Sequence, residues 1–262
     1  MRLNFDVSVA SHFRSASQRA RVLTEAWVDS QVYCPNCGLL GIDKYPNNNP
    51  AADFHCSNCH EDYELKSKNS KIGTRVVDGA YRTLIQKLRG NTNPNLFLLN
   101  YDPRSAEVLN FFVIPKHFFI PEIIEKRKPL APTARRAGWV GCNILLHDIP
   151  PTGIIYFVKN RIIESRVKVL SCWKKTLFLR EEKELVAKGW LLDVMRCVER
   201  LNQSFSLDEV YSFAGELGIK HPENRHIKDK IRQQLQVLRE RGYLEFIANP
   251  GTRTEFLRGL VY

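Results

Sequence analysis

Residues 34–66 read CPNCGLLGIDKYPNNNPAADFHCSNCHEDYELK, and this stretch decides the fold that we expect for the chain. It holds two cysteine pairs with the overall spacing C-x2-C-x18-C-x2-C, made by Cys34, Cys37, Cys56 and Cys59. Each pair places two thiolates on one tight turn, and two facing turns complete the tetrahedron of ligands that Zn²⁺ adopts. Four thiolates leave no position for water, so the spacing predicts a structural zinc site. His55 and His60 flank the second pair and are alternative ligands, which we consider less favoured.

The second cysteine pair also predicts a β-hairpin, with strands at 52–56 and 63–67 and the knuckle as its turn. In such a hairpin Asp53 on the first strand lies beside Glu64 on the second. Successive side chains of a strand alternate between faces, so Glu64 and Lys66 share one face. Two carboxylates on one face form a hard-oxygen site suited to Mg²⁺. Lys66 can orient or deprotonate a water there, and its charge can offset negative charge on a phosphate.

The pattern Asp53…Glu64-Leu65-Lys66 resembles the active site of the PD-(D/E)XK nuclease superfamily. Ala52 stands where the motif has proline, which is its least functional position. The resemblance implies Mg²⁺-dependent hydrolysis of a phosphodiester, with Asp53, Glu64 and Lys66 as the catalytic residues. Asp53, Glu64 and the backbone carbonyl of Leu65 are expected to hold the metal, and Lys66 to position the attacking water.

The resemblance extends along the whole chain to the methyl-directed type II restriction endonucleases. The segments that carry it are CPNCG (34–38), ADFHCSNC (52–59), ELKSK (64–68), DGAY (78–81), RKPLAPTARRAGWVGCN (127–143) and HIKDKIRQQLQ (226–236). It implies cleavage of double-stranded DNA at GATC sites that contain N6-methyladenine, leaving a 5′-phosphate and a 3′-hydroxyl. Spacing and charge alone reach only a zinc-containing, metal-dependent DNA nuclease. The GATC site and the methyl requirement come entirely from the resemblance.

The first 182 residues have a mixed pattern of helices and strands. We expect helices at 16–30, 76–89 and 167–180, strands at 95–100 and 108–115, a hairpin from 154–158 and 161–164, and a loop at 121–137. We therefore predict an α/β (α+β) PD-(D/E)XK nuclease core with an inserted four-cysteine zinc site. It forms the endonuclease domain, residues 1–182.

Residues 183–262 are predicted to form a winged helix-turn-helix domain that binds DNA. Helices are expected at 185–201, 206–217 and 224–241, followed by two short strands at 242–247 and 254–260 around a Pro-Gly turn. Ser206 and Glu209 have the spacing of a capping box at the second helix. Three helices followed by a hairpin are the element order of a winged helix.

The chain carries 39 basic and 28 acidic side chains, a net charge of +11 that favours binding to a polyanion. The predicted DNA-contacting residues are Arg135, Arg136 and Trp139 in one loop, and Arg225, His226, Lys228, Arg232 and Gln233 at the start of the last helix. Each arginine of the loop could read guanine or contact phosphate, and Trp139 could pack on a methylated base or in the core. Either Gln233 or Gln234 could pair with adenine. Glu25, on the first helix, could approach the metal site, but it is interpreted as a solvated helix charge and is not included among the site residues.

No apolar run reaches the roughly 18 to 20 residues of a membrane span. We expect a cytoplasmic, bacterial protein that binds double-stranded DNA with methylated GATC, no membrane and no obligate protein partner. Two alternatives remain. One is a nuclease of the same fold that is indifferent to methylation. The other is a zinc-ribbon, winged-helix transcription factor without catalysis, which predicts Mg²⁺-independent binding and no role for Lys66.

Overall fold

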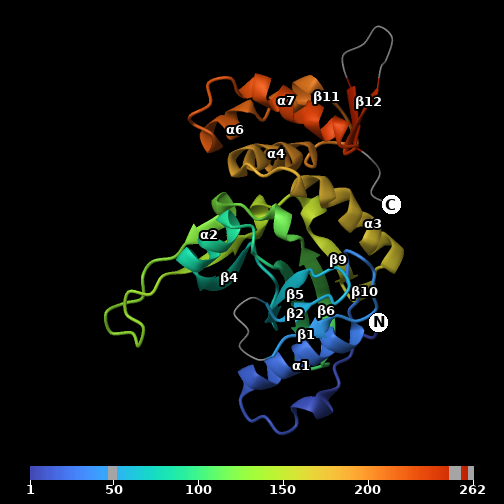
Figure 1. The fold of residues 1–262 in the computed structure, drawn as a ribbon, viewed down its shortest axis with the longest axis vertical. Coiled ribbons are helices and arrows are strands. Elements are labelled where there is room, and N and C mark those ends of the chain that lie inside the picture. The colour runs from blue at the N-terminus through green and yellow to red at the C-terminus, as the bar shows by residue number, and fades with distance from the viewer. Residues whose placement is uncertain (47–51, 248–254, 259–262) are drawn as a thin grey trace. The chain divides into compact units, whose positions relative to one another are not determined.

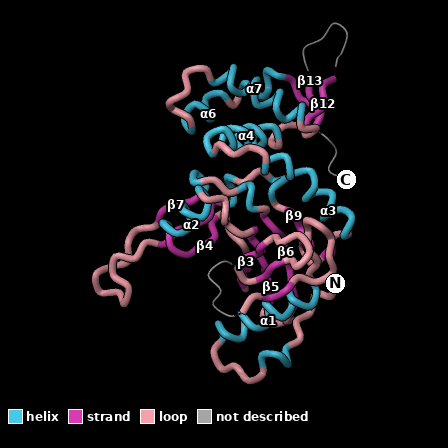
Figure 2. The backbone as a smooth tube through the Cα atoms, viewed as in Figure 1, coloured by secondary structure: helices cyan, strands magenta, loops and turns pink. Residues whose placement is uncertain are grey.

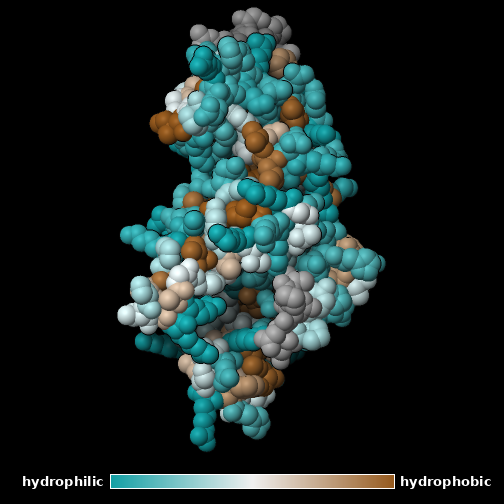
Figure 3. Space-filling model, turned by 60° about the vertical axis from the view of Figure 1, so that its left-hand side comes forward, coloured by the Kyte–Doolittle hydropathy of each residue, from teal (hydrophilic) through white to brown (hydrophobic). Residues whose placement is uncertain are grey.

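The computed structural model describes residues 1–46, 52–247 and 255–258. The chain forms two compact units: the first contains residues 1–146 and 152–176, and the second contains residues 147–151 and 177–262 (Figure 1). Among the described residues, no helix has the length and apolar character needed to cross a membrane. The face drawn in Figure 3 is mostly hydrophilic, with apolar side chains gathered only in small, separate patches.

The first unit is built on a seven-stranded sheet with the order β1-β2-β3-β5-β6-β9-β10. Its strands are β1 (Asp43–Lys44), β2 (Phe54–His55), β3 (Asp62–Lys68), β5 (Asn95–Asp102), β6 (Glu107–Ile114), β9 (Ile155–Lys159) and β10 (Ile162–Ile163). Neighbouring strands are antiparallel except for the parallel pair β3 and β5. The prediction of the hairpin at 52–56 and 63–67 is confirmed, as are those of the strands at 95–100 and 108–115 and of the hairpin that follows.

An aromatic core joins this sheet to helix α1 (Ala16–Gln31), which packs against β3 (Figure 2). Trp27 of α1 meets Phe111 edge-on at 5.2 Å between ring centroids. Phe111 in turn lies 5.0 Å from Phe97 and 5.1 Å from Phe157, and all three phenylalanines are fully buried. Burial of such large rings supplies much of the stabilisation of a core. The strands that carry the predicted catalytic residues therefore rest on a rigid, close-packed support.

A second sheet of the first unit has the order β4-β8-β7 and carries helix α2. Its elements are β4 (Arg75–Ala80), α2 (Tyr81–Arg89), β7 (Ile124–Lys126) and β8 (Gly141–Leu145). The prediction of one helix over 76–89 is wrong for its first five residues, because that segment pairs with β8 instead. The β-branched pair Val76 and Val77 favours the strand. The predicted loop at 121–137 contains β7, and β8 was not predicted.

The remaining elements of the first unit are α3 (Arg166–Thr176) and short 3₁₀ helices at Val7–Ala10, Lys116–Phe118, Pro121–Ile123 and Pro151–Gly153, the last shared with the second unit. Two further 3₁₀ turns, Leu146–Asp148 and Leu177–Arg180, lie at the points where the chain passes between the units. The helix expected at 167–180 thus ends as an α-helix at Thr176.

The second unit holds the expected helices and a three-stranded sheet of order β11-β13-β12. Its elements are α4 (Leu185–Val198), β11 (Ser204–Ser206), α5 (Leu207–Tyr211), α6 (Ala214–Lys220), α7 (Ile227–Glu240), β12 (Leu244–Ile247) and β13 (Glu255–Arg258). The capping box of Ser206 and Glu209 is confirmed. The predicted helix 206–217 is split in two, because the Ser212 hydroxyl donates to the Glu209 carbonyl at 2.6 Å and competes with the helical bonds there. The predicted turn at 248–253 lies outside the described residues.

Candidate active site and DNA-binding surfaces

The hairpin of β2 and β3 places Asp53 directly beside Glu64. The Asp53 amide donates to the Tyr63 carbonyl at 3.0 Å, which continues the pairing of the two strands past their regular residues. The Asp53 carboxylate accepts the amide hydrogen of Leu65 at 2.8 Å. Asp53 and Glu64 both line a pocket of about 200 Å³. The two carboxylates therefore share one opening, as the strand register predicted.

Lys66 lies in the same cluster and is held by two carboxylates. Its Nζ is 2.7 Å from Glu64 Oε1 and 2.7 Å from Asp78 Oδ1. Burial alone would lower the pKa of Lys66, but the charges of Glu64 and Asp78 outweigh it and raise that pKa above its usual value. Lys66 is therefore a cation at neutral pH. In this arrangement the Lys66 ammonium can orient a water by donating a hydrogen bond to it.

The donor set of this pocket fits a hard divalent cation. Asp53 is half-buried, the Glu64 side chain is 34% exposed, and both come from strands fixed in the sheet. Carboxylates and backbone carbonyls are the oxygen ligands that Mg²⁺ takes in proteins. Pairing of Lys66 with Glu64 also indicates how the negative charge of the pocket is balanced before a metal binds.

The four cysteines of the two predicted knuckles come together in one cluster. Their sulfur atoms all lie within 4.8 Å of one another, and the pairs Cys34 with Cys59 and Cys37 with Cys56 are 3.5 Å apart. A tetrahedral site with Zn–S bonds of about 2.3 Å has sulfur atoms separated by roughly 3.8 Å. The cluster could therefore hold a zinc ion with little rearrangement.

The two knuckles have the same backbone turn, in which the residue directly after each cysteine pair has a positive φ. Gly38 and His60, each directly after the second cysteine of its pair, have φ values of 79° and 58°. Their amides donate to the carbonyls of Cys34 and Cys56, both at 2.9 Å. His60 thus occupies a left-handed turn position. His55 packs against Tyr45 with 4.4 Å between ring centroids and the rings tilted by 39°, and neither histidine belongs to the four-cysteine cluster among the described residues.

The loop that holds the predicted base-reading residues projects from β7 and β8 as an extension of their hairpin, and we call residues 126–139 the basic arm (Figure 1). The Leu130 amide donates to the Trp139 carbonyl at 2.9 Å, which keeps the two sides of the arm together. Arg135 and Arg136 are exposed, and the Arg136 guanidinium stacks over the Trp139 ring at 4.5 Å. Trp139 is half-buried, so the interpretation of Trp139 as a core residue is wrong.

Helix α7 has a polar face and a buried face. The predicted contact residues Lys228, Arg232 and Gln233 lie on the polar face, and Arg225 and His226 directly precede the helix. All five are exposed. Ile231, Leu235 and Leu238 are buried. Gln234 is only 5% exposed, so its interpretation as a partner for adenine is wrong, and Gln233 is the glutamine on the exposed face. The helical period explains the difference, since Gln234 and Ile231 are three residues apart.

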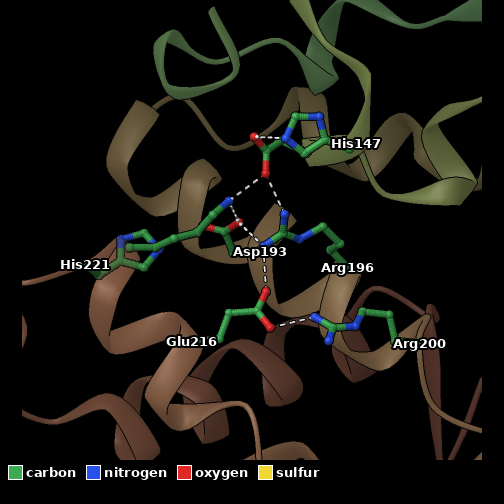
Figure 4. Close-up of polar contacts among 8 residues, drawn as sticks. His147, Asp193, Arg196, Arg200, Glu216 and His221 are labelled. Carbon is green, nitrogen blue, oxygen red and sulfur yellow. Dashed lines mark hydrogen bonds and ion pairs between the residues drawn. The ribbon is translucent and has the colours of Figure 1, made fainter. Parts of the chain in front are cut away.

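A network of charged side chains fixes α6, the helix that precedes α7, to α4 (Figure 4). Its members are His147, Asp148, Asp193, Arg196, Arg200, Glu216, Lys220 and His221. Asp193 accepts from Lys220 at 2.8 Å and contacts His221 at 2.9 Å, while Arg196 pairs with Glu216 at 3.1 Å. Burial raises the pKa of Asp148, but its hydrogen bond to Lys220 and the nearby positive charges prevail and lower it overall.

Both parts of the chain match models of known protein families. Residues 1–182 match the model of the DpnI family, described as the Dam-replacing family, and residues 186–253 match the model described as the Dam-replacing HTH domain, DpnI_C. The chain belongs to the DpnI family. It is therefore a methylation-dependent type II restriction endonuclease, a site-specific deoxyribonuclease, and DNA is its partner. The fold prediction of a mixed α/β core followed by a helix-turn-helix domain is confirmed.

Two acidic residues of this DpnI-family protein were missed by sequence reasoning. Glu25 was interpreted as a solvated helix charge, which is wrong, because it is only 6% exposed and pairs with Arg21 at 2.6 Å and Lys44 at 2.7 Å. Asp78 lines the same pocket as Asp53 and Glu64. Its place depends on β4, which was predicted as helix, although the adjacent β-branched pair offered a signal for a strand.

Proposed function

We propose that this protein hydrolyses double-stranded DNA at GATC sites containing N6-methyladenine, in a Mg²⁺-dependent reaction. The observation that carries this proposal is that Asp53 and Glu64 line one pocket, and that Lys66 pairs with Glu64 at 2.7 Å. Residues 1–182 would form the endonuclease domain and residues 183–262 the winged-helix domain. The four-cysteine cluster would hold a structural zinc ion that fixes the turn of the catalytic hairpin.

In this mechanism Asp53, Glu64 and the Leu65 carbonyl would hold the metal. Magnesium, when bound, supplies Lewis-acid polarisation of the scissile phosphate. Asp53 is kept in place by the Leu65 amide, which donates to its carboxylate at 2.8 Å. The Lys66 ammonium donates a hydrogen bond to the attacking water and offsets the charge that develops on the phosphate oxygens. The water oxygen attacks phosphorus in line with the 3′ oxygen, and the P–O3′ bond breaks. The attacking water releases a proton to bulk solvent and the leaving 3′ oxygen takes one up from bulk solvent, which gives a 5′-phosphate and a 3′-hydroxyl.

Two surfaces would read the DNA. In the basic arm, the exposed Arg135 and Arg136 would contact phosphate or guanine, and Trp139 would pack on the methylated base. The exposed residues Lys228, Arg232 and Gln233 of α7, with Arg225 and His226 directly before its first turn, would enter the major groove, as the last helix of a helix-turn-helix does. Burying one methyl group is worth only about 1 kcal/mol. Two readers of the same modified site would discriminate better than one.

Three proteins test the active-site assignment: the parent, Asp53→Ala and Lys66→Ala. Cleavage of a methylated GATC duplex is measured with Mg²⁺, and binding of the same duplex is measured with Ca²⁺ in place of Mg²⁺. Both variants should bind within a few-fold of the parent yet lose cleavage, because neither residue contributes much to DNA affinity. A cutting rate within a few-fold of the parent in either variant would remove that residue from the mechanism.

A further inference from the structure

The side chain of Asp78 contacts the predicted catalytic lysine from another sheet. Lys66 lies on β3, whereas Asp78 lies on β4, and the Asp78 side chain is only 9% exposed. Its Oδ1 is 2.7 Å from Lys66 Nζ. A buried carboxylate is costly unless it is paired, so this contact is expected to persist in solution.

The backbone around Asp78 holds the carboxylate in one position. Asp78 is paired with Cys142 of β8, and the register of β4 on β8 shifts between Asp78 and Ala80. A bulge of this kind re-aims the side chain beside it, and bulges are common next to active sites. The Gly79 amide donates to Asp78 Oδ1 at 2.7 Å, which fixes the rotation of the carboxylate. Asp78 is thus oriented independently of the strands that carry Asp53 and Glu64.

We propose that Asp78 is a positioning residue, which holds the Lys66 ammonium in place for the reaction. The proposal rests on the function proposed above. Glu64 also pairs with Lys66, but Glu64 is committed to the metal when one binds, and a divalent cation nearby repels the ammonium. Asp78 is then the carboxylate that remains to balance the positive charge of Lys66 and to orient its ammonium group. Asp78 acts through Lys66 and touches neither the metal nor the phosphate.

The test uses the full-length protein and the substitution Asp78→Asn, which keeps the shape and removes the charge. Its matched control is Asp29→Asn, which removes one negative charge from an exposed position on α1 of the same unit. The single-turnover rate on a methylated GATC duplex should fall about 10- to 100-fold in Asp78→Asn, the loss expected for one charge-assisted hydrogen bond. The control should keep the parental rate. Half-saturating DNA concentration should be unchanged in both.

Binding of Ca²⁺, measured by calorimetry, separates a positioning residue from a metal ligand. Asp78→Asn should bind Ca²⁺ within about three-fold of the parent, and a loss above ten-fold would show that Asp78 is a ligand and overturn the proposal. Asp78→Glu, which keeps the charge but moves it by one methylene, should cut at a rate between those of the parent and Asp78→Asn. If Asp78→Asn does not fold, a parental rate in Asp78→Glu overturns the proposal on its own.

Lys66→Ala, assayed in parallel, distinguishes the two ways to fail. A parental rate in Lys66→Ala contradicts the proposed active site itself. A slow Lys66→Ala together with a parental rate in Asp78→Asn contradicts only the role of Asp78. Equal slowing of Asp78→Asn and Asp29→Asn also overturns it, because the effect would then be a general one of charge.

Discussion

Replacing Cys59 by serine should remove the zinc and weaken the first unit. Structural zinc contributes about 10–16 kcal/mol in small zinc-binding peptides, which equals or exceeds the whole stability of a typical domain. The sulfur atoms of two pairs are already 3.5 Å apart, so the folded protein can bind zinc with little rearrangement of these ligands. Loss of one ligand in four should cost roughly 3 kcal/mol or more, which lowers Tm by about 10 °C in a unit of this size.

The assay combines zinc content, measured by elemental analysis after gel filtration, with thermal unfolding followed by circular dichroism. Cys172→Ser is the matched control, since Cys172 is a half-buried thiol of the same unit outside the cluster. The parent and the control should carry one zinc per chain, and Cys59→Ser much less. Activity should fall with zinc, because the second knuckle is the turn between the strands that place Asp53 and Glu64. A Cys59→Ser protein with full zinc content, or with a Tm within 2 °C of the parent, would refute this reasoning.

Three further outcomes are expected. Trp139→Ala should slow cleavage of methylated DNA about ten-fold while leaving weak, salt-sensitive binding to unmethylated DNA unchanged; equal losses on both would contradict a role in methyl reading. Arg232→Ala should weaken duplex binding and lower the slope of log affinity against log salt by about one, measured by fluorescence anisotropy, and an unchanged slope would argue against a phosphate contact. Because the pKa of Asp148 is lower in the folded protein than in the unfolded chain, its carboxylate stabilises the second unit at pH values above the unfolded pKa of about 4. This contribution to stability is lost as the pH falls through the folded pKa. Thermal melts of Asp148→Asn between pH 2.5 and 7 should therefore show a smaller decline of Tm on acidification than melts of the parent, and identical declines would contradict this contribution of Asp148.

Local patterns predicted the parts of the fold that depend on near neighbours. The cysteine spacing and the alternation of Glu64 and Lys66 on one strand specified the hairpin, because its turn is short and its register follows from the knuckle. Helix α1, the central strands and the capping box at Ser206 likewise rest on periodicity and cap chemistry.

The second sheet of the first unit could not be predicted in the same way. Residues 76–80 carry apolar groups at helical spacing, but pairing with β8, more than sixty residues later, overrides that pattern. Asp78 reaches Lys66 through this long-range pairing, so the β-branched pair could have indicated the strand but not the contact with Lys66. The burial of Glu25 was missed for a related reason, because one of its two partners, Lys44, lies on β1 and not on the helix that carries Glu25.

The most direct test of the proposed function is a comparison of one plasmid prepared with and without N6-methyladenine at its GATC sites. Each form is incubated with the purified protein and Mg²⁺, and the products are mapped to sequence. We expect cleavage of the methylated plasmid alone, at GATC, and none when Mg²⁺ is chelated. Equal cleavage of both forms, cleavage at other sequences, or binding without cleavage in Mg²⁺ would contradict the proposal.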